Sequence, residues 1–205
     1  MSQWMKRLIK KKMTENKKII LTDCDGVLLD WESGFHEWMT SHGYERKVTG
    51  VYEMEIAYGI EKSECKRLVK EFNESAWMCC LDPLRDARSG VAKLVDAGYR
   101  FICITSLSLD PYAKKLREDN LNRVFGEGIF TDVVCLDTGA DKDEALQPYK
   151  DSGLWWIEDK TENAVLGADL GLKCVLVDHE HNSDCVDERI AKVDNWAQIS
   201  DLILA

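Results

Sequence analysis

The chain has 205 residues, a length that fits one domain with a sizeable core or a domain that carries a lid. Its formal net charge of −10 and its isoelectric point near 5.0 argue against binding to duplex DNA or RNA, because the phosphate backbone requires a basic surface. A small anionic substrate is compatible with this charge, since local cations, a bound metal ion and helix N-termini can make a positive pocket in an acidic protein.

The N-terminal segment departs from the acidic trend. Residues 1–12 read MSQWMKRLIKKK, and Met13 opens a segment that leads directly into the first apolar run. We interpret residues 1–17 as a disordered basic tail, or residues 1–12 as sequence upstream of a start at Met13; the alternative is that residues 1–12 form an amphipathic segment that contacts a membrane or nucleic acid. The segment is too poor in apolar residues for a signal peptide, and no run reaches membrane-spanning length. We therefore expect a cytoplasmic protein without a membrane partner.

Two aspartates follow the first apolar run. Ile19, Ile20 and Leu21 are typical of a strand that is buried on both faces of a parallel sheet. Open α/β folds bind small molecules at the carboxyl ends of such strands, so Asp23 and Asp25 are expected in a binding crevice. A carboxylate there can attack phosphorus, and two carboxylates can share one Mg²⁺ ion. The plainer interpretation is a turn, because Asp-Gly is an ordinary turn signal.

Later apolar runs also lead into polar groups. Thr105 and Ser106 end the second run, and their hydroxyls can donate hydrogen bonds to phosphate oxygens. Glu158 and Asp159 end the fourth run, and Lys142 lies between these runs at the expected start of a helix. Each group alone is explained as a helix cap or a solvated side chain. Their order along the chain instead indicates one site that binds phosphate and a metal ion.

The remaining sequence predicts an α/β core with a helical insertion. Within residues 31–81, apolar side chains such as Trp31, Phe35 and Trp38 have helical spacing, so we expect a compact helical cap. Residues 18–30 and 82–205 are expected to form a parallel sheet with helices on both faces. The predicted helices are 86–97, 112–124, 162–170 and one beginning near residue 143, and the later predicted strands are 100–105, 129–136, 154–157 and 174–177.

Four short motifs together resemble a known family. They are DCDGVL from Asp23, ICITS from Ile102, Lys142, and IED from Ile157, and the set is similar to that of the haloacid dehalogenase-like superfamily of phosphohydrolases. Within it the chain looks most similar to the 5'(3')-deoxyribonucleotidases, through DCDGVLLDWESGF, CLDPLRDA from Cys80, VDHEHN and VDNW. The resemblance covers nearly the whole chain. It implies a three-layer Rossmann-like core with a small cap inserted after the first strand, and Mg²⁺-dependent phosphomonoesterase activity.

The resemblance also implies roles for individual residues. Asp23 would be the nucleophile and a Mg²⁺ ligand. Asp25 would protonate the leaving oxygen, then activate the hydrolytic water, and would contact Mg²⁺ through its carbonyl. Asp159 would complete the metal site, with Glu158 supporting it directly or through water. The phosphate would be held by Thr105, Ser106 and Lys142.

The substrate is defined less closely than the reaction. The resemblance implies a nucleoside or deoxynucleoside monophosphate whose base packs against cap aromatics, with Trp77 preferred because it lies where the cap returns to the core. The other cap candidates, which could equally be the cap's own core, are Trp31, Phe35, Tyr52 and Met78. Gly139 and Ala140 stand where the family often has an arginine two positions before the lysine. A sugar phosphate or another small metabolite, a non-catalytic binding role and a homodimer therefore stay open.

Cysteines and histidines add two weaker expectations. None of the eight cysteines forms a CxxC pair, so we expect free thiols of a reduced compartment, with the adjacent Cys79 and Cys80 either packed or redox sensitive. His179 and His181 lie among acidic residues and could bind a transition metal. A loop after the last parallel strand is the preferred interpretation of that segment.

Overall fold

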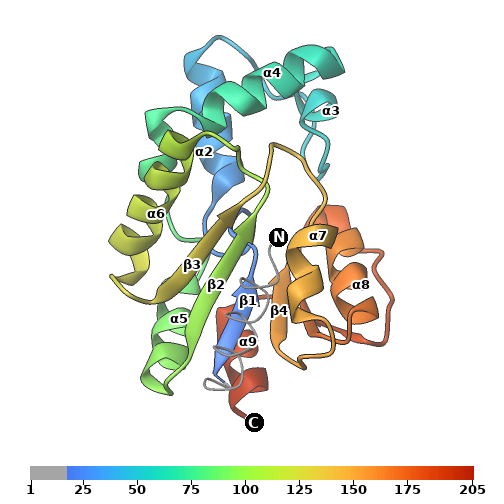
Figure 1. The fold of residues 1–205 in the computed structure, drawn as a ribbon. Helices are drawn as coiled ribbons and strands as arrows, with labels where there is room; N and C mark the ends of the chain where they lie inside the picture. The colour runs from blue at the N-terminus through green and yellow to red at the C-terminus, as the bar shows by residue number, and fades with distance from the viewer. Residues whose placement is uncertain (1–17) are drawn as a thin grey trace.

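The computed structural model describes residues 18–205, so the expectations for the basic tail at 1–17 lie outside the described residues. A parallel sheet of six strands forms the centre, in the order β3-β2-β1-β4-β5-β6 (Figure 1). The strands are β1 (Ile19–Thr22), β2 (Arg100–Thr105), β3 (Phe130–Cys135), β4 (Trp155–Glu158), β5 (Lys173–Val177) and β6 (Ile190–Val193). Successive strands run outward from β1 on one side and from β4 on the other. Ligands bind at such a reversal of strand order, beyond the carboxyl ends.

Helices cover both faces of this sheet. Alternate side chains of β1 divide between them: Ile20 packs into one hydrophobic cluster, and Ile19 and Leu21 pack into the other. The first cluster includes α5 (Ala87–Asp96), α6 (Pro111–Phe125) and α9 (Trp196–Leu204); the second includes α7 (Asp143–Leu146) and α8 (Thr161–Asp169). This alternation reflects the period of two along a strand. The expected three-layer α/β fold is confirmed.

Residues 31–81 are helical and lie beyond the carboxyl ends of β1 and β2 (Figure 1). They contain α2 (Trp31–Ser41), α3 (Met54–Tyr58), α4 (Lys62–Asn73) and the short 3₁₀ helix η1 (Ala76–Cys79). The two chain segments that connect this cap to the core pair with each other, since Asp30 N donates to Asp82 O at 2.9 Å and Leu84 N donates to Leu28 O at 2.9 Å. The cap interior belongs to the same hydrophobic cluster as α5, α6 and α9.

The C-terminal end of the fold was not predicted. β5 is not the last parallel strand, because β6 follows it and α9 then returns along the sheet. α9 is anchored by Asp86, whose carboxylate accepts the backbone N–H groups of Trp196 at 2.9 Å and Ala197 at 2.8 Å. The indole of Trp196 donates to Val27 O at 2.8 Å, directly behind the loop that follows β1. Within residues 18–205, no helix combines the length and apolar character that a membrane span requires.

Candidate active site

The loop after β1 holds Asp23 firmly against β4. Asp23 N donates to Ile157 O at 2.8 Å, and its Oδ1 accepts the Cys24 N–H at 2.7 Å. Asp23 is only 8% exposed, so most of its carboxylate is enclosed at the edge of the sheet. Backbone and side chain are thus both fixed, as a reacting group requires.

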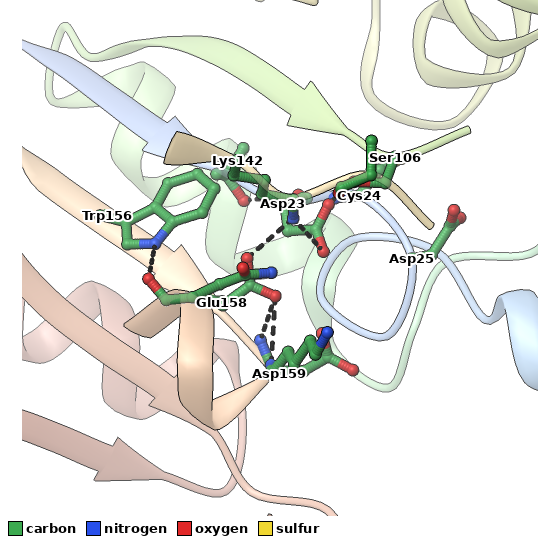
Figure 2. Close-up of polar contacts among 12 residues, drawn as sticks. Asp23, Cys24, Asp25, Ser106, Lys142, Trp156, Glu158 and Asp159 are labelled. Carbon is green, nitrogen blue, oxygen red and sulfur yellow. Dashed lines mark hydrogen bonds and ion pairs between the residues drawn. The ribbon is translucent and has the colours of Figure 1, made fainter. Parts of the chain in front are cut away.

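Lys142 is a buried cation beside Asp23. It immediately precedes α7, as expected, and is 2% exposed. Its Nζ lies 2.7 Å from Asp23 Oδ2 and 2.8 Å from Glu158 Oε2, with the Trp156 ring 5.2 Å away (Figure 2). Burial alone would lower the pKa of Lys142, but the two carboxylates outweigh it and raise the pKa, so the amine stays charged.

Three carboxylates meet at this edge. One oxygen each of Asp23, Glu158 and Asp159 lie within 4.8 Å of one another. Burial raises the pKa of Asp23 to about 7, with Glu158 adding to the effect, and burial together with Asp23 raises the pKa of Asp159 to about 7. Oxygen ligands held this close, at a cost in charge repulsion, are the donor set that Mg²⁺ prefers. The residues present therefore fit the ion that the sequence implied.

Glu158 supports this group from behind. It is fully buried, and its Oε1 accepts the backbone N–H groups of Asp159 at 3.2 Å and Lys160 at 3.1 Å, while Oε2 binds Lys142. Both oxygens are thus committed to holding Lys142 and the backbone that carries Asp159. Contacts of this kind orient metal ligands without replacing them.

Gly26 allows the loop after β1 to reach Asp159. Its φ is +71°, and a Cβ atom at this position would lie 2.3 Å from Asp159 Oδ2. Only glycine combines this backbone angle with so close an approach. The Gly26 carbonyl also makes a 2.7 Å hydrogen bond with His179 Nε2, which ties the loop to the segment after β5.

Asp25 is separated from the three carboxylates. Figure 2 shows its carboxyl group turned away from Asp23, Glu158 and Asp159. It faces Arg117 of α6, whose Nη2 lies 2.7 Å from Oδ1 and 3.0 Å from Oδ2. Burial raises the pKa of Asp25, and the guanidinium opposes that rise. Sequence reasoning missed Arg117, because an arginine in a helix with many charged residues is ordinarily solvated.

The hydroxyl pair lies at the end of β2, next to β1. Thr105 is 1% exposed, and its carbonyl accepts the Leu136 N–H at 2.9 Å. Ser106 Oγ donates to Ala140 O at 2.7 Å and so holds the loop that leads to Lys142. The structure therefore brings Thr105 and Ser106 to the same sheet edge as Asp23, with the Ser106 proton already used within the protein.

Comparisons with known sequences find a partial relative of this chain. No family model matches the chain. An uncharacterized 32.4 kDa protein from the Gp30-rIII intergenic region of Enterobacteria phage T4 is 28% identical over 142 residues, 66% of this chain and 50% of that protein. The chain therefore spans about half the length of the curated relative that it matches.

Solved structures decide the fold. L-2-haloacid dehalogenase from Xanthobacter autotrophicus superposes with a TM-score of 0.60 at 11% identity, over 92% of this chain and 98% of that one. The fold is that of the haloacid dehalogenase-like hydrolases. The D,D-heptose 1.7-bisphosphate phosphatase of B. bronchiseptica, complexed with magnesium and phosphate, has a TM-score of 0.56 at 13% identity, over 91% of this chain and 98% of that chain. Neither structure is similar enough to carry more than the fold.

In this haloacid dehalogenase-like fold, cap aromatics differ in their access to the site. Phe35 and Met78 are fully buried, so they belong to the cap's own core, whereas Trp77 is 37% and Tyr52 48% exposed. Trp31 stacks on Phe35 at 4.7 Å. Desolvation and the negative charge of Asp159 raise the pKa of the Tyr52 hydroxyl, although nearly half of the whole residue is exposed.

Tyr52 meets the core at the segment after β5. Its ring lies edge-on to the His181 ring at 5.1 Å, and Lys160 Nζ is 5.5 Å from its centroid. His181 in turn stacks on His179 at 5.2 Å, and its Nε2 lies 3.2 Å from Asp159 O. The histidines therefore border the carboxylate group. Across residues 18–205 no cluster of metal-binding side chains includes them.

The cysteines differ in how far they are buried. All eight cysteines are free, and Cys24, Cys65, Cys103 and Cys174 are buried. Cys135, by contrast, is only partly buried. Cys79 Sγ and Cys80 Sγ lie 3.2 Å apart beside the return from the cap, and Cys80 is exposed. Packing therefore does not account for Cys80.

Proposed function

We propose that this chain is a Mg²⁺-dependent phosphomonoesterase that works through a phosphoaspartate at Asp23. The observation that carries the proposal is the meeting of the Asp23 carboxylate with Lys142 Nζ at 2.7 Å and with the carboxylates of Glu158 and Asp159. A nucleophile, a fixed cation and a set of hard oxygen ligands are the groups that phosphoryl transfer requires. The fold shared with a phosphatase that binds magnesium and phosphate supports the same conclusion.

The reaction divides into two steps at one aspartate. An oxygen of Asp23 attacks phosphorus as the bond to the leaving oxygen breaks, and Asp25 gives that oxygen its proton. Water then attacks the phosphoaspartate, Asp25 takes the water proton back, and inorganic phosphate leaves with Asp23 restored. Asp23, Asp159 and the Asp25 carbonyl would hold Mg²⁺, with Glu158 in support; the ion neutralises charge on the phosphoryl oxygens.

Other residues hold the phosphate during both steps. Lys142 balances charge on the phosphoryl group from its fixed position, and Thr105 offers a hydroxyl from the adjacent strand end. Ser106 keeps the loop before Lys142 in place through Ala140. These contacts strengthen as charge moves onto the equatorial oxygens, which is how such sites favour the transition state.

For the substrate we propose a nucleoside or deoxynucleoside monophosphate, with a sugar phosphate as the second candidate. Trp77 and Tyr52 are the cap aromatics with exposed surface for a base. The heptose bisphosphate phosphatase of the same fold supports the second candidate. A cytoplasmic location fits the free thiols.

The decisive experiment measures Mg²⁺-dependent phosphate release from a panel of nucleoside and sugar monophosphates. Asp23→Asn should abolish release, while Asp132→Asn, which changes an exposed aspartate of β3, should retain it. Equal release by wild type and Asp23→Asn would exclude the proposed mechanism. Trp77→Ala and Tyr52→Ala separate the substrates, since loss of base stacking should raise KM about 2- to 10-fold for nucleotides and leave KM for a small sugar phosphate unchanged.

A further inference from the structure

Arg117 is fully buried, and its guanidinium pairs with one carboxylate. It lies in the middle of α6, and its guanidinium contacts Asp25, with Nη2 at 2.7 Å from Oδ1 and 3.0 Å from Oδ2. Its other contacts are sulfur atoms: Nη1 lies 3.1 Å from Cys24 Sγ, and Nη2 lies 3.5 Å from Met78 Sδ. Among the described residues, 18–205, the Nε atom finds no hydrogen-bond partner. Sulfur is a weak acceptor, so within residues 18–205 the Asp25 carboxylate is the main compensation for this buried charge.

Burying Arg117 in this way costs free energy of folding that an apolar side chain would not cost. A guanidinium out of water requires good compensation, and here one nitrogen is left unpaired. A methionine or leucine would fill the same space without that cost. What Arg117 supplies that an apolar side chain cannot is a fixed positive charge beside the Asp25 carboxyl group. That carboxyl group is turned away from Asp23, Glu158 and Asp159 (Figure 2).

A divalent cation bound beside Asp23 would compete with Arg117 for the Asp25 carboxylate. Asp25 lies two residues after Asp23 on the same loop, so its carboxylate can be drawn toward an ion held there. A carboxylate coordinated to that metal ion would not be free to face the leaving oxygen. We propose that Arg117 is a positioning residue that holds the Asp25 side chain off the cation site and available to the leaving group. This inference rests on the proposed role of Asp25 as the acid.

The test separates leaving groups that need a proton from those that do not. An alkyl phosphate such as a nucleoside 5'-monophosphate expels a strongly basic alkoxide, whereas p-nitrophenyl phosphate expels a weakly basic phenolate. With enzyme in excess, leaving-group release in the first turnover reports phosphoryl transfer to Asp23 alone. Arg117→Met should slow release from the alkyl phosphate about 10- to 100-fold and from p-nitrophenyl phosphate less than about 3-fold, because general acid catalysis contributes about 10²- to 10⁴-fold. Arg117→Lys should lie between Arg117→Met and wild type.

Controls distinguish positioning from a merely structural role. Arg123→Met changes an arginine of the same helix, which binds Leu81 O at 2.7 Å and Cys79 O at 3.2 Å, and should leave both rates unchanged. Mg²⁺ affinity measured by calorimetry should stay equal or increase in Arg117→Met. Equal slowing of both substrates, or weakened Mg²⁺ binding, would overturn the inference.

A double-mutant cycle covers the case in which Arg117→Met fails to fold. Asp25→Asn with Arg117→Met removes both charges, so no buried charge stays uncompensated. In the Asp25→Asn background Arg117→Met should not slow alkyl release further; additive losses would refute the inference. If Asp25→Asn slows release from the alkyl phosphate and from p-nitrophenyl phosphate equally, Asp25 is not the general acid. If Asp25→Asn slows mainly the alkyl phosphate but Arg117→Met does not, Asp25 remains the general acid and Arg117 does not position it.

Discussion

Without its divalent cation, this protein should lose free energy of unfolding as the pH rises from about 5 to about 8. Burial raises the folded-state pKa of Asp23 from 3.8 to about 7. A raised carboxyl pKa means that the folded state binds more protons than the unfolded chain between those values, so stability is lost as pH increases. About two of the three pKa units lie above pH 5, and at 1.36 kcal/mol per unit this amounts to about 3 kcal/mol for one carboxylate.

The neighbouring Asp159 shows the same shift, but the two groups interact, so we expect about 3 kcal/mol for the pair rather than twice that value. Partly buried His179, whose pKa is lowered by desolvation, acts in the opposite sense below about pH 6.5. The difference between wild type and Asp23→Asn removes that common contribution. Asp23→Asn should therefore show a clearly flatter pH dependence.

Urea denaturation with EDTA, at pH values from about 5 to about 8, measures this free energy of unfolding. Saturating Mg²⁺ should restore most of the loss at the upper end, because an ion that binds only the folded state stabilises it by mass action. A stability in EDTA that is flat or rises over this range in wild type would refute the raised carboxyl pKa that the burial of Asp23 implies. Equal slopes for wild type and Asp23→Asn would assign the effect to other groups.

Three further results are expected. Lys142→Met leaves Glu158 buried without its cation and should lower the metal-free free energy of unfolding by about 3–5 kcal/mol near neutral pH, measured by urea denaturation. Little change would mean that Lys142 does not make these contacts in solution. Gly26→Ala places a Cβ 2.3 Å from Asp159 Oδ2 and should weaken Mg²⁺ binding about 10- to 100-fold in calorimetry, whereas Gly128→Ala, with a φ of +74° and open space around it, should leave the affinity unchanged. In timed thiol labelling Cys80 should react first and the buried cysteines only on unfolding; labelling of Cys24 at the rate of Cys80 would contradict the packing.

The sequence predicted the sheet edge because each polar group follows a strand. Parallel strands bring their carboxyl ends to one side, so Asp23 and Asp159 were expected at the same edge of the sheet, and they meet because β1 lies beside β4. The sequence could not supply the strand order, which depends on how helices pack across the two faces. It also left β6 unrecognised: IAKV is four residues long, carries a lysine and lies at the edge of the sheet, where alternation is weak.

Tertiary packing alone distinguishes the arginines of α6. Arg117 and Arg123 lie in the same polar sequence, PYAKKLREDNLNRVF, and neither follows a strand. One is completely buried against Asp25, and the other is exposed and binds backbone carbonyls of the segment that returns from the cap. Periodicity places Arg117 on the face of Ala113, Leu116 and Leu121, but an arginine on an apolar face is ordinarily expected to extend to solvent.

The two aspartates of the DCD motif thus have separate buried cations: Asp23 has Lys142, and Asp25 has Arg117. Their proposed tasks conflict, since a nucleophile must be ionised when the general acid must be protonated, and the residues lie only two positions apart. A single shared cation would tie both carboxylates to the same place. With Lys142 on the β4 side and Arg117 on the α6 side, each carboxylate is oriented independently. Lys142→Met should therefore slow phosphoryl transfer from alkyl and p-nitrophenyl phosphates alike, whereas Arg117→Met should slow mainly the alkyl substrate. Among residues 18–205 of this acidic protein, the two fully or nearly fully buried cations, Lys142 and Arg117, each contact one of these two aspartates.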